Sequence, residues 1–358
     1  MAALSASAFA VILAGGSGTR FWPASRRSLP KQYLPIGGPR PLIAETLARL
    51  EGLVPPERTL VVSAAEQAEA LGRALPSLPR ENLLHEPCAR NTAASVAWAA
   101  LEIRRRSSDS VQVVLPADHV IRPAERLRAS LRAGLEEAAA SGALVTFGIR
   151  PTRPATGFGY IELGAALAPR DGQAVHRVLR FVEKPERERA QQFLASGRFL
   201  WNAGIFAWRT DSILAALARH APSTLEGLSA ALGGGDFAAR FEALPSVSID
   251  VAVLEREGDV RTLPIDYFWS DVGAWNSLAD VVEPDAAGNR RSGGAELSVL
   301  DASNNIVHGD AGALVALIGV ENLVVVRAGD AVLVATRERA DEVRALVERL
   351  AREKPRFV

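Results

Sequence analysis

Short, strongly apolar runs recur between helix-like stretches in the first part of this chain. Four of them are FAVIL (9–13), RTLVVS (58–63), VQVVLPAD (111–118) and ALVTFGI (143–149). They lack the polar alternation of a strand with one solvated face, so each predicts a strand that is buried on both sides. Such strands separated by helices indicate a parallel sheet covered on both faces, which is a doubly wound α/β fold.

The segments between these runs have apolar residues at helical spacing. We expect helices within 41–53, 64–75, 93–106 and 126–140, and Asn91 and Thr92 are suited to cap the third of them. After Pro151 the pattern loosens. Further strands are predicted within 159–163, 175–184 and 200–208, and further helices over 211–221 and 243–256.

The composition changes again at DAAGNRRSGG (285–294), a polar, glycine-rich stretch typical of a linker. Beyond it, short apolar pieces follow one another with Gly, Asn or Asp between them, and a mixed charged and leucine-rich helix is expected over 338–354. Short strands without intervening helices indicate a coiled β-solenoid or a small sandwich. The chain is therefore predicted to contain two domains, residues 1–284 and residues 285–358.

Charge and cysteine content exclude several classes of protein. The 358 residues carry 41 basic and 41 acidic side chains, so no overall basic field favours nucleic acid or an acidic membrane surface. The single cysteine, Cys88, excludes an intrachain disulfide framework and a Cys-rich zinc site, which fits a reducing cytoplasm. The apolar run near the N-terminus breaks at Gly15 and has no basic segment before it. We therefore expect no signal peptide and no membrane span.

The stretch VILAGGSGTRFWPASRRSLPKQ (11–32) joins a predicted strand to a glycine loop with fixed positive charge. Glycine lets backbone N–H groups approach a ligand closely, and Arg20, Arg26, Arg27 and Lys31 surround the loop, a combination that suits phosphate oxygens. Neither the Rossmann fingerprint nor the P-loop pattern is matched. An ordinary glycine turn with solvated basic residues remains the alternative.

Other candidate residues stand at predicted strand ends or inside apolar segments. Asp118 ends the third apolar run, in the place where open α/β sheets bind ligands, and Asp271 lies between aromatic residues in FWSDVGAW. Together they would suit Mg²⁺ that also contacts phosphates, although each could be only a turn or cap residue. Lys184 could bind a second phosphate or be solvated, and Asn202 could bind sugar hydroxyls or only backbone. All five histidines, including His119, are interpreted as structural.

Taken in order, the segments GGSGTRFWPASRRSLPKQ, EPCARNTAA, LPADH, TGFGYI, FVEKP, WNAGIF, SIDVAVLE and FWSDVG resemble the sugar-phosphate nucleotidyltransferases, in particular their guanylyl branch. The resemblance runs from about Phe9 to the last helix. It implies a Rossmann-like catalytic domain followed by a short left-handed β-helix. Relatives with a further isomerase domain exist, and that activity is expected to be absent because the chain ends at Val358.

The resemblance also implies a reaction, in which GTP and α-D-mannose 1-phosphate give GDP-mannose and pyrophosphate with the help of Mg²⁺. Arg20, Lys31 and Lys184 would be the catalytic charges, and Asp118 and Asp271 would hold the metal. The implied sugar-phosphate residues are Gly159, Glu183, Lys184, Asn202 and Asp250. The implied nucleotide-binding residues are Leu13, Ala14, Gly15, Gly16, Gly18, Thr19, Glu86, Arg90, Asn91, Thr92 and Asp118.

Two alternatives to this function remain at the level of sequence. One is a sibling enzyme with another base or hexose, and the other is a non-catalytic subunit of the same fold, which the retained charged positions disfavour. One departure from the pattern is visible, because Val251, Leu254 and Arg256 stand where relatives usually have Tyr, Met and Lys. We also expect a cytoplasmic homodimer formed through the C-terminal strands, whose apolar runs would be protected by a partner.

Overall fold

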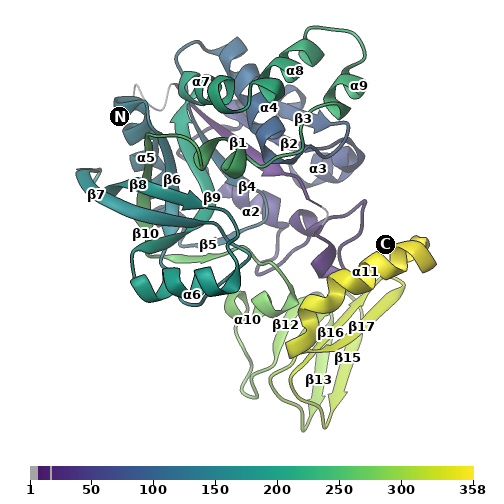
Figure 1. Ribbon diagram of the computed structural model, residues 1–358. Coiled ribbons are helices and arrows are strands. Elements are labelled where there is room, and N and C mark those ends of the chain that lie inside the picture. Colours follow the sequence, from purple (N-terminus) through teal and green to yellow (C-terminus); the bar gives the residue numbers. More distant parts are fainter. Residues whose placement is uncertain (1–6, 17) are drawn as a thin grey trace.

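The structure is a computed structural model that describes residues 7–16 and 18–358. Within these residues the larger part of the chain is built on one nine-stranded sheet in the order β3-β2-β1-β4-β9-β6-β10-β8-β7 (Figure 1). Its strands are β1 (Ala8–Ala14), β2 (Thr59–Ala64), β3 (Leu83–Glu86), β4 (Val111–Pro116), β6 (Leu144–Ile149), β7 (Tyr160–Arg170), β8 (Gln173–Val182), β9 (Phe199–Arg209) and β10 (Val260–Ile265).

The sheet is mixed rather than wholly parallel. β1 pairs in parallel with β2 and β4, as the apolar runs predicted. β2 also pairs in parallel with β3, a short strand that the sequence analysis did not predict. β9, however, runs antiparallel between β4 and β6, so the expectation of a purely parallel sheet is corrected at this strand. Because β9 is reversed, its first residues lie at the same edge of the sheet as the last residues of β1, β3 and β4.

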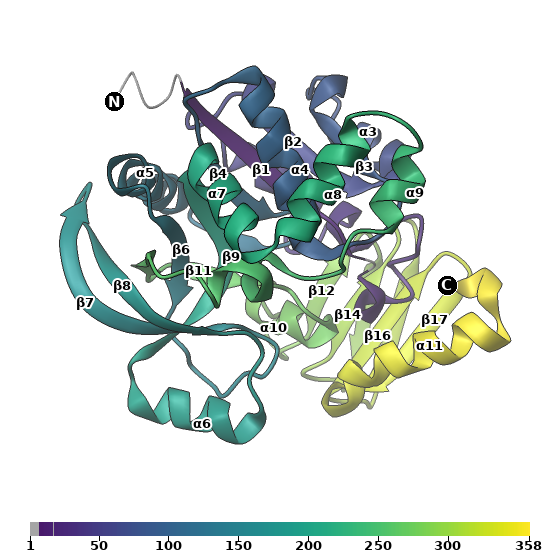
Figure 2. The ribbon, with the colours of Figure 1, turned by 45° about the horizontal axis from the view of Figure 1, so that its top comes forward.

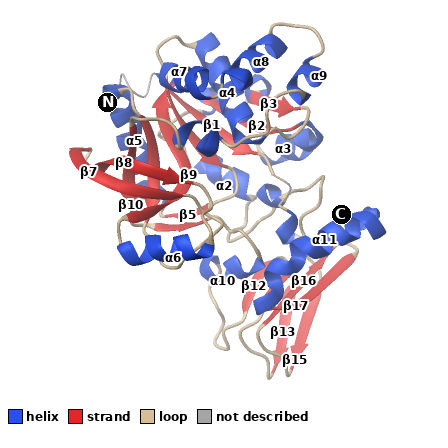
Figure 3. Ribbon diagram, viewed as in Figure 1, coloured by secondary structure: helices blue, strands red, loops and turns tan. Residues whose placement is uncertain are grey.

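Helices cover both faces of the sheet (Figure 3). Along β1, Ala10 and Ile12 belong to one apolar cluster and Phe9 and Val11 to another, as expected of a strand with two buried faces. The first cluster includes residues of α2 (Leu42–Ala48), α3 (Ala68–Ala74) and α5 (Ala124–Ser141). The second includes residues of α4 (Asn91–Arg106), α7 (Thr210–His220), α8 (Pro222–Leu232) and α9 (Phe237–Glu242). The two layers confirm the doubly wound α/β class.

One predicted helix is largely wrong. Residues 243–256 form only a π-helical turn at Asp250–Leu254, and residues 245–248 before it have no regular secondary structure. Pro245 disfavours helix for the residue before it and interrupts the first half of the predicted helix. The remaining elements of this part are α6 (Arg187–Ser196), the short α10 (Leu278–Val281), and the pair of β5 (Val120–Arg122) with β11 (Phe268–Ser270).

The C-terminal strands form a β-helix. Parallel strands β12, β14 and β16 make one sheet, which β17 extends in antiparallel orientation, and β13 and β15 make another. From β12 to β16 successive strands alternate between the two sheets, so the sandwich alternative is wrong. Asn305 donates to the side-chain oxygen of Asn289 in the coil before it (3.0 Å). The bounds are β12 (Arg290–Gly293), β13 (Glu296–Leu300), β14 (Ile306–Gly309), β15 (Leu314–Ile318), β16 (Leu323–Ala328), β17 (Ala331–Thr336) and α11 (Val343–Glu353).

The β-helix and α11 pack against the segment that follows β1. Figures 1 and 2 both show this purple segment beside the yellow α11. Phe21 and Trp22 share an apolar cluster with Val343 and Val347 of α11. The Trp22 indole donates to the backbone oxygen of Phe357 (2.7 Å). The C-terminal part of the chain therefore supports the glycine loop directly.

No helix in the part of the chain that the structure describes is both long enough and apolar enough to cross a membrane.

Candidate active site

Two cavities open at the edge of the sheet where β1, β3 and β4 end. The broad cavity, about 570 Å³, is lined by the ends of these strands and by residues of the β7–β9 region. The charged cavity, about 560 Å³, lies between the glycine loop and α11. Asp118, His119 and Asp271 line both cavities. A ligand that passed these three residues would therefore occupy two chemically different spaces at once.

The glycines of the loop have different roles. Gly15 and Gly16 line the broad cavity, and a Cβ added to either would have no neighbour within 4 Å in this ligand-free structure. At Gly18, by contrast, an added Cβ would lie 2.6 Å from Cβ of Lys31, and φ is +57°. Gly18 is thus required by the packing of the loop on Lys31. Of the neighbouring predicted residues, Leu13 lines the broad cavity, and Ala14 is buried and accepts from the Gln32 amide.

The other two predicted residues of the loop line the charged cavity. Thr19 and Arg20 lie in the 3₁₀ turn Thr19–Phe21. The Arg20 guanidinium is exposed and donates a long hydrogen bond, 3.5 Å, to the backbone oxygen of Gly273. A guanidinium held this loosely is able to turn toward an anion.

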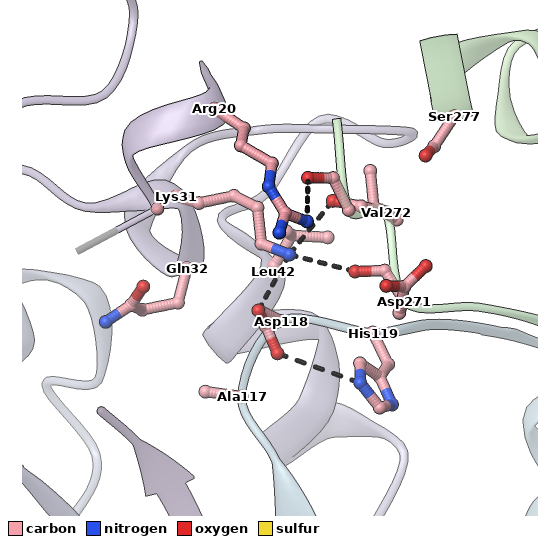
Figure 4. Close-up of polar contacts among 12 residues, drawn as sticks. Arg20, Lys31, Gln32, Leu42, Ala117, Asp118, His119, Asp271, Val272 and Ser277 are labelled. Atoms are coloured by element: carbon pink, nitrogen blue, oxygen red, sulfur yellow. Dashed lines mark hydrogen bonds and ion pairs between the residues drawn. The ribbon is translucent and has the colours of Figure 1, made fainter. Parts of the chain in front are cut away.

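Lys31 is almost fully buried at the junction of the two cavities (Figure 4). Its ammonium lies 2.7 Å from Oδ2 of Asp118 and donates to the backbone oxygens of Asp271 (2.8 Å) and Val272 (2.9 Å). An ammonium has three protons to donate, and all three are directed at these acceptors. Lys31 therefore joins the two predicted metal-binding segments.

The structure brings the two predicted metal ligands to the same two cavities. Asp118 follows β4 and Asp271 follows β11, and both line both cavities. Burial alone raises the pKa of Asp118, but the charge and hydrogen bond of the Lys31 ammonium, together with smaller neighbouring effects, hold the pKa below its usual range. Within the described residues, no cluster of three or more His, Cys, Asp or Glu is placed to hold a metal ion. Mg²⁺ is commonly held by one or two carboxylates together with substrate phosphates and water, so this pair fits such an ion.

Sequence reasoning missed His119 and Trp269 as site residues. His119 lines both cavities, and Trp269 donates from its indole to Nδ1 of His119 (3.2 Å). Burial lowers the pKa of His119 more than the nearby carboxylates raise it, so the imidazole is neutral, with its hydrogen on Nε2. Phe158 packs edge-on against Trp269 with ring centroids 5.3 Å apart, and both rings face the broad cavity. The sequence offered one indication of these two residues, because His119 directly follows Asp118 and Trp269 lies two positions before Asp271.

One end of the broad cavity is formed by β3 and the start of α4. Glu86 is buried, accepts from the Ser95 hydroxyl (2.7 Å), and has its pKa raised by burial to about 7. Asn91 and Thr92 also line this end. The Asn91 side chain accepts from the backbone N–H of Thr92, and the Thr92 hydroxyl accepts from that of Ile249. Arg90 is directed elsewhere, because its guanidinium donates to the backbone oxygen of Glu242 (2.8 Å).

The other end holds all of the predicted sugar-phosphate residues. The Asn202 amide donates to Oδ1 of Asp250 (2.9 Å), and its oxygen accepts from the Thr146 hydroxyl (3.0 Å). Burial, followed by the nearby Glu183 carboxylate, raises the pKa of Asp250 to about 7. Lys184 is largely exposed and its ammonium lies 2.8 Å from Oε1 of Glu183.

Gly159 lies beside Glu183 and Asn202, and a larger residue at this position would displace the Glu183 side chain. The backbone oxygen of Gly159 accepts from the N–H of Asn202 (2.8 Å), and a Cβ on Gly159 would lie 2.5 Å from Oε2 of Glu183. The missing side chain therefore lets Glu183 turn into the cavity.

Comparison with known proteins places this geometry in a family context. Residues 9–287 match the family described as nucleotidyl transferase, and residues 296–350 match the MannoseP isomerase/GMP-like beta-helix domain. Members of the first family typically use a divalent metal ion. The chain is 41% identical to a mannose-1-phosphate guanylyltransferase of Klebsiella pneumoniae, over 94% of this chain and 73% of that protein. It is 39% identical to the alginate biosynthesis protein AlgA of Pseudomonas aeruginosa, over 95% of this chain and 71% of that one.

Among solved structures, a Thermus thermophilus protein described as a mannose-1-phosphate geranyltransferase is similar over 96% of this chain and 99% of its own. The TM-score is 0.87 and the sequence identity is 37%. The family match covers more than half of the chain, and it includes both cavities apart from the α11 side of the charged one. The chain therefore belongs to the nucleotidyl transferase family.

Proposed function

We propose that this protein converts GTP and α-D-mannose 1-phosphate into GDP-mannose and pyrophosphate. The proposal depends on one observation: the broad cavity and the charged cavity share Asp118, His119 and Asp271 as lining residues. This arrangement suits a reaction at the α-phosphorus, with the base and the sugar on one side and the leaving pyrophosphate on the other. The name of the relative at 41% identity, a mannose-1-phosphate guanylyltransferase, supports the choice of guanine and mannose.

In the proposed reaction an oxygen of the sugar phosphate attacks the α-phosphorus in line. One P–O bond forms to the sugar phosphate, the bond from the α-phosphorus to the bridging oxygen breaks, and pyrophosphate leaves. A phosphate monoester is largely a dianion at neutral pH, so no proton has to be removed from the nucleophile. The neutral His119 is therefore not needed as a base. The task of the protein is to position the reactants and to neutralise charge.

On the nucleotide side, the backbone of Leu13, Ala14, Gly15, Gly16 and Gly18 would follow the nucleotide, with Thr19 and Arg20 at its β- and γ-phosphates. Lys31 would stabilise the phosphates from the position where it joins the segments of Asp118 and Asp271. Glu86, Asn91 and Thr92 would bind the base. Arg90 was also predicted for this role, but it would act only by releasing its hydrogen bond to Glu242.

On the sugar side, Glu183, Asn202 and Asp250 offer carboxylate and amide groups for hydroxyls, and Gly159 lets the sugar approach the backbone. The exposed Lys184 would leave Glu183 to bind the phosphate of the sugar. The divalent metal ion, which we propose is Mg²⁺ held by Asp118 and Asp271, would neutralise negative charge on the phosphates that react.

Further proposals concern the whole chain. Residues 1–284 would form the catalytic domain and residues 285–358 the β-helix domain, for which a left-handed coil is predicted. We also propose that the protein is cytoplasmic and forms a homodimer through the C-terminal strands. Leu300, Leu314 and Ile318 of β13 and β15 are each more than half exposed and support that interface.

The function is tested by incubating the protein with each pairing of GTP, ATP, UTP and dTTP with mannose, glucose and galactose 1-phosphates, and by measuring release of pyrophosphate. We expect the highest kcat/KM for GTP with mannose 1-phosphate. A clear preference for dTTP or UTP would assign the protein to a sibling activity. Absence of turnover with every pair, despite folded protein and Mg²⁺, would favour a non-catalytic role.

A further inference from the structure

The charged cavity has a wall that belongs to the C-terminal helix. Arg344 and Glu348, one turn apart on α11, line it opposite the glycine loop. Between them Val347 is buried against the cluster that contains Phe21, so the helix is fixed at this point and both charged side chains face the cavity. Neither residue was a candidate from the sequence, and the mechanism proposed above uses neither.

The cations of this cavity differ in how free they are to meet an anion. Among its described lining residues the cationic side chains are Arg20, Lys31 and Arg344. Lys31 is committed to three acceptors. Arg344 is about two-thirds exposed, and its Nε donates to Oε1 of Glu348 (3.1 Å), an exposed contact of the kind that contributes little to stability. The guanidinium is therefore available to a stronger acceptor.

We propose that Arg344 of α11 binds the pyrophosphate group, as the β- and γ-phosphates of the substrate and as the product before it leaves. This inference rests on the proposed function and adds a residue from the β-helix domain to it. Phosphate oxygens accept from a guanidinium in a bidentate manner and carry more charge than one carboxylate, so pyrophosphate displaces Glu348 from Arg344. Glu348 then stands beside the anion and weakens its binding, which favours release.

The first test uses inorganic pyrophosphate with Mg²⁺ as the probe and measures its binding to the full chain by calorimetry. We expect Arg344→Ala to weaken binding about five- to tenfold, the effect of one charge-assisted contact at an exposed site. Arg349→Ala is the matched control, because Arg349 forms the same kind of i,i+4 pair with Glu353 on α11 but does not line the cavity. It should bind pyrophosphate like the wild type.

The second variant changes binding in the opposite direction. Glu348→Gln frees Arg344 and removes a negative charge from the cavity wall, so pyrophosphate should bind about two- to fivefold more tightly. Glu353→Gln, its control, should leave binding unchanged. Equal binding in Arg344→Ala and Arg349→Ala, or weaker binding in Glu348→Gln, would overturn the proposal.

Kinetics separate this inference from the proposed function. In the reverse reaction, Arg344→Ala should raise the KM for pyrophosphate while the KM for the nucleotide sugar stays within about twofold. If the wild type bound pyrophosphate through Arg344 but turned over no nucleotide with any sugar phosphate, the proposed function would be refuted. The assignment of Arg344 as a pyrophosphate-binding residue would still be supported. If turnover were normal and Arg344→Ala changed neither pyrophosphate parameter, the inference would fail alone.

Discussion

The ammonium of Lys31 lies 2.7 Å from Oδ2 of Asp118, and the same ammonium donates to the backbone oxygen of Asp271. A single buried cation thus links the end of β4 to the segment after β11, while the backbone and Cβ of Lys31 lie beside Gly18 of the glycine loop. Removing it would leave the Asp118 carboxylate without its main partner in a partly buried place.

We expect Lys31→Met to lower the free energy of unfolding by about 2–3 kcal/mol, because a charged hydrogen bond is lost and a carboxylate is left poorly compensated. Urea denaturation at neutral pH measures the change. Adding Asp118→Asn to Lys31→Met should recover part of the loss, since the neutral amide does not need the cation. Stability equal to the wild type in Lys31→Met would contradict the role given to this contact.

Asp118→Asn and Asp271→Asn should each reduce turnover by at least ~10²-fold, because each removes one of two anionic ligands from the proposed metal site. Both variants should also need more Mg²⁺ to reach half of their own maximal rate. Steady-state assays over a Mg²⁺ series measure both effects, with Asp266→Asn, an exposed aspartate outside both cavities, as the control. Wild-type rates at limiting Mg²⁺ in either variant would argue against that ligand.

Asp250 should make the free protein less stable as the pH rises. Its pKa is raised to about 7 by burial and by Glu183, so the folded protein keeps a proton that the unfolded chain releases near pH 4. The stabilisation from this group is therefore complete at low pH and is lost as the pH rises from about 4 through about 7. Asp250→Asn, which mimics the protonated form, should flatten the decline. Urea denaturation at half-unit steps from pH 5 to pH 8 measures it.

Glu86 contributes a decline of the same sign, because burial raises its pKa to about 7 as well. The slope should therefore become smaller, but not vanish, in Asp250→Asn. An unchanged slope in that variant would mean that Asp250 is ionised throughout this pH range.

Glu86→Gln should reduce kcat/KM for GTP about tenfold or more. Guanine offers two donors, N1–H and N2–H₂, which suit a buried carboxylate, whereas the glutamine amide would direct its own donor at one of them. Inosine triphosphate lacks the 2-amino group, so the preference for GTP over inosine triphosphate should shrink in the variant. Glu81→Gln, at the exposed start of the same strand region, is the control. An unchanged preference would place base recognition elsewhere.

The wild type should be a dimer by light scattering at micromolar concentration, and Ile318→Glu should be a monomer. Ile318 is 69% exposed and pairs in register with Leu300, which is 58% exposed, so a charge there would lie within the proposed interface. Leu179→Glu introduces the same charge at an equally exposed leucine of β8 and should remain a dimer. A monomeric wild type would refute the interface.

Features that depend on the residues of a single strand could be predicted from the sequence. The ends of β1 and β4 were expected to carry ligand-binding residues, because parallel strands place these ends along one crevice. Gly15 and Asp118 do lie together there, and Glu86 joins them from β3, a strand that the apolar pattern did not predict. The direction of β9 was not readable, since reversing a strand changes its neighbours and not its apolar content. That reversal brings Asn202 to the same edge.

Contacts between distant segments were also beyond the sequence. The pattern of α11 specifies an amphipathic helix, but it does not say that Arg344 faces the glycine loop. Nor could the sequence show that Lys31 is held by the main-chain oxygens of Asp271 and Val272, because any residue presents the same oxygen. His119 was interpreted as structural for a similar reason, since its importance comes from Trp269, 150 positions away.

The glycine loop finally bears on how this protein tolerates variation. Gly15 has open space around it, so an added methyl group there would leave the free fold intact and would intrude on a nucleotide bound in the proposed way. At Gly18 the same methyl group would collide with Lys31. Two glycines three positions apart thus separate two kinds of defect: one yields a soluble, folded and inactive protein, and the other yields a chain whose folding and catalysis fail together. A deep mutational library sorted first for abundance and then for activity would tell them apart.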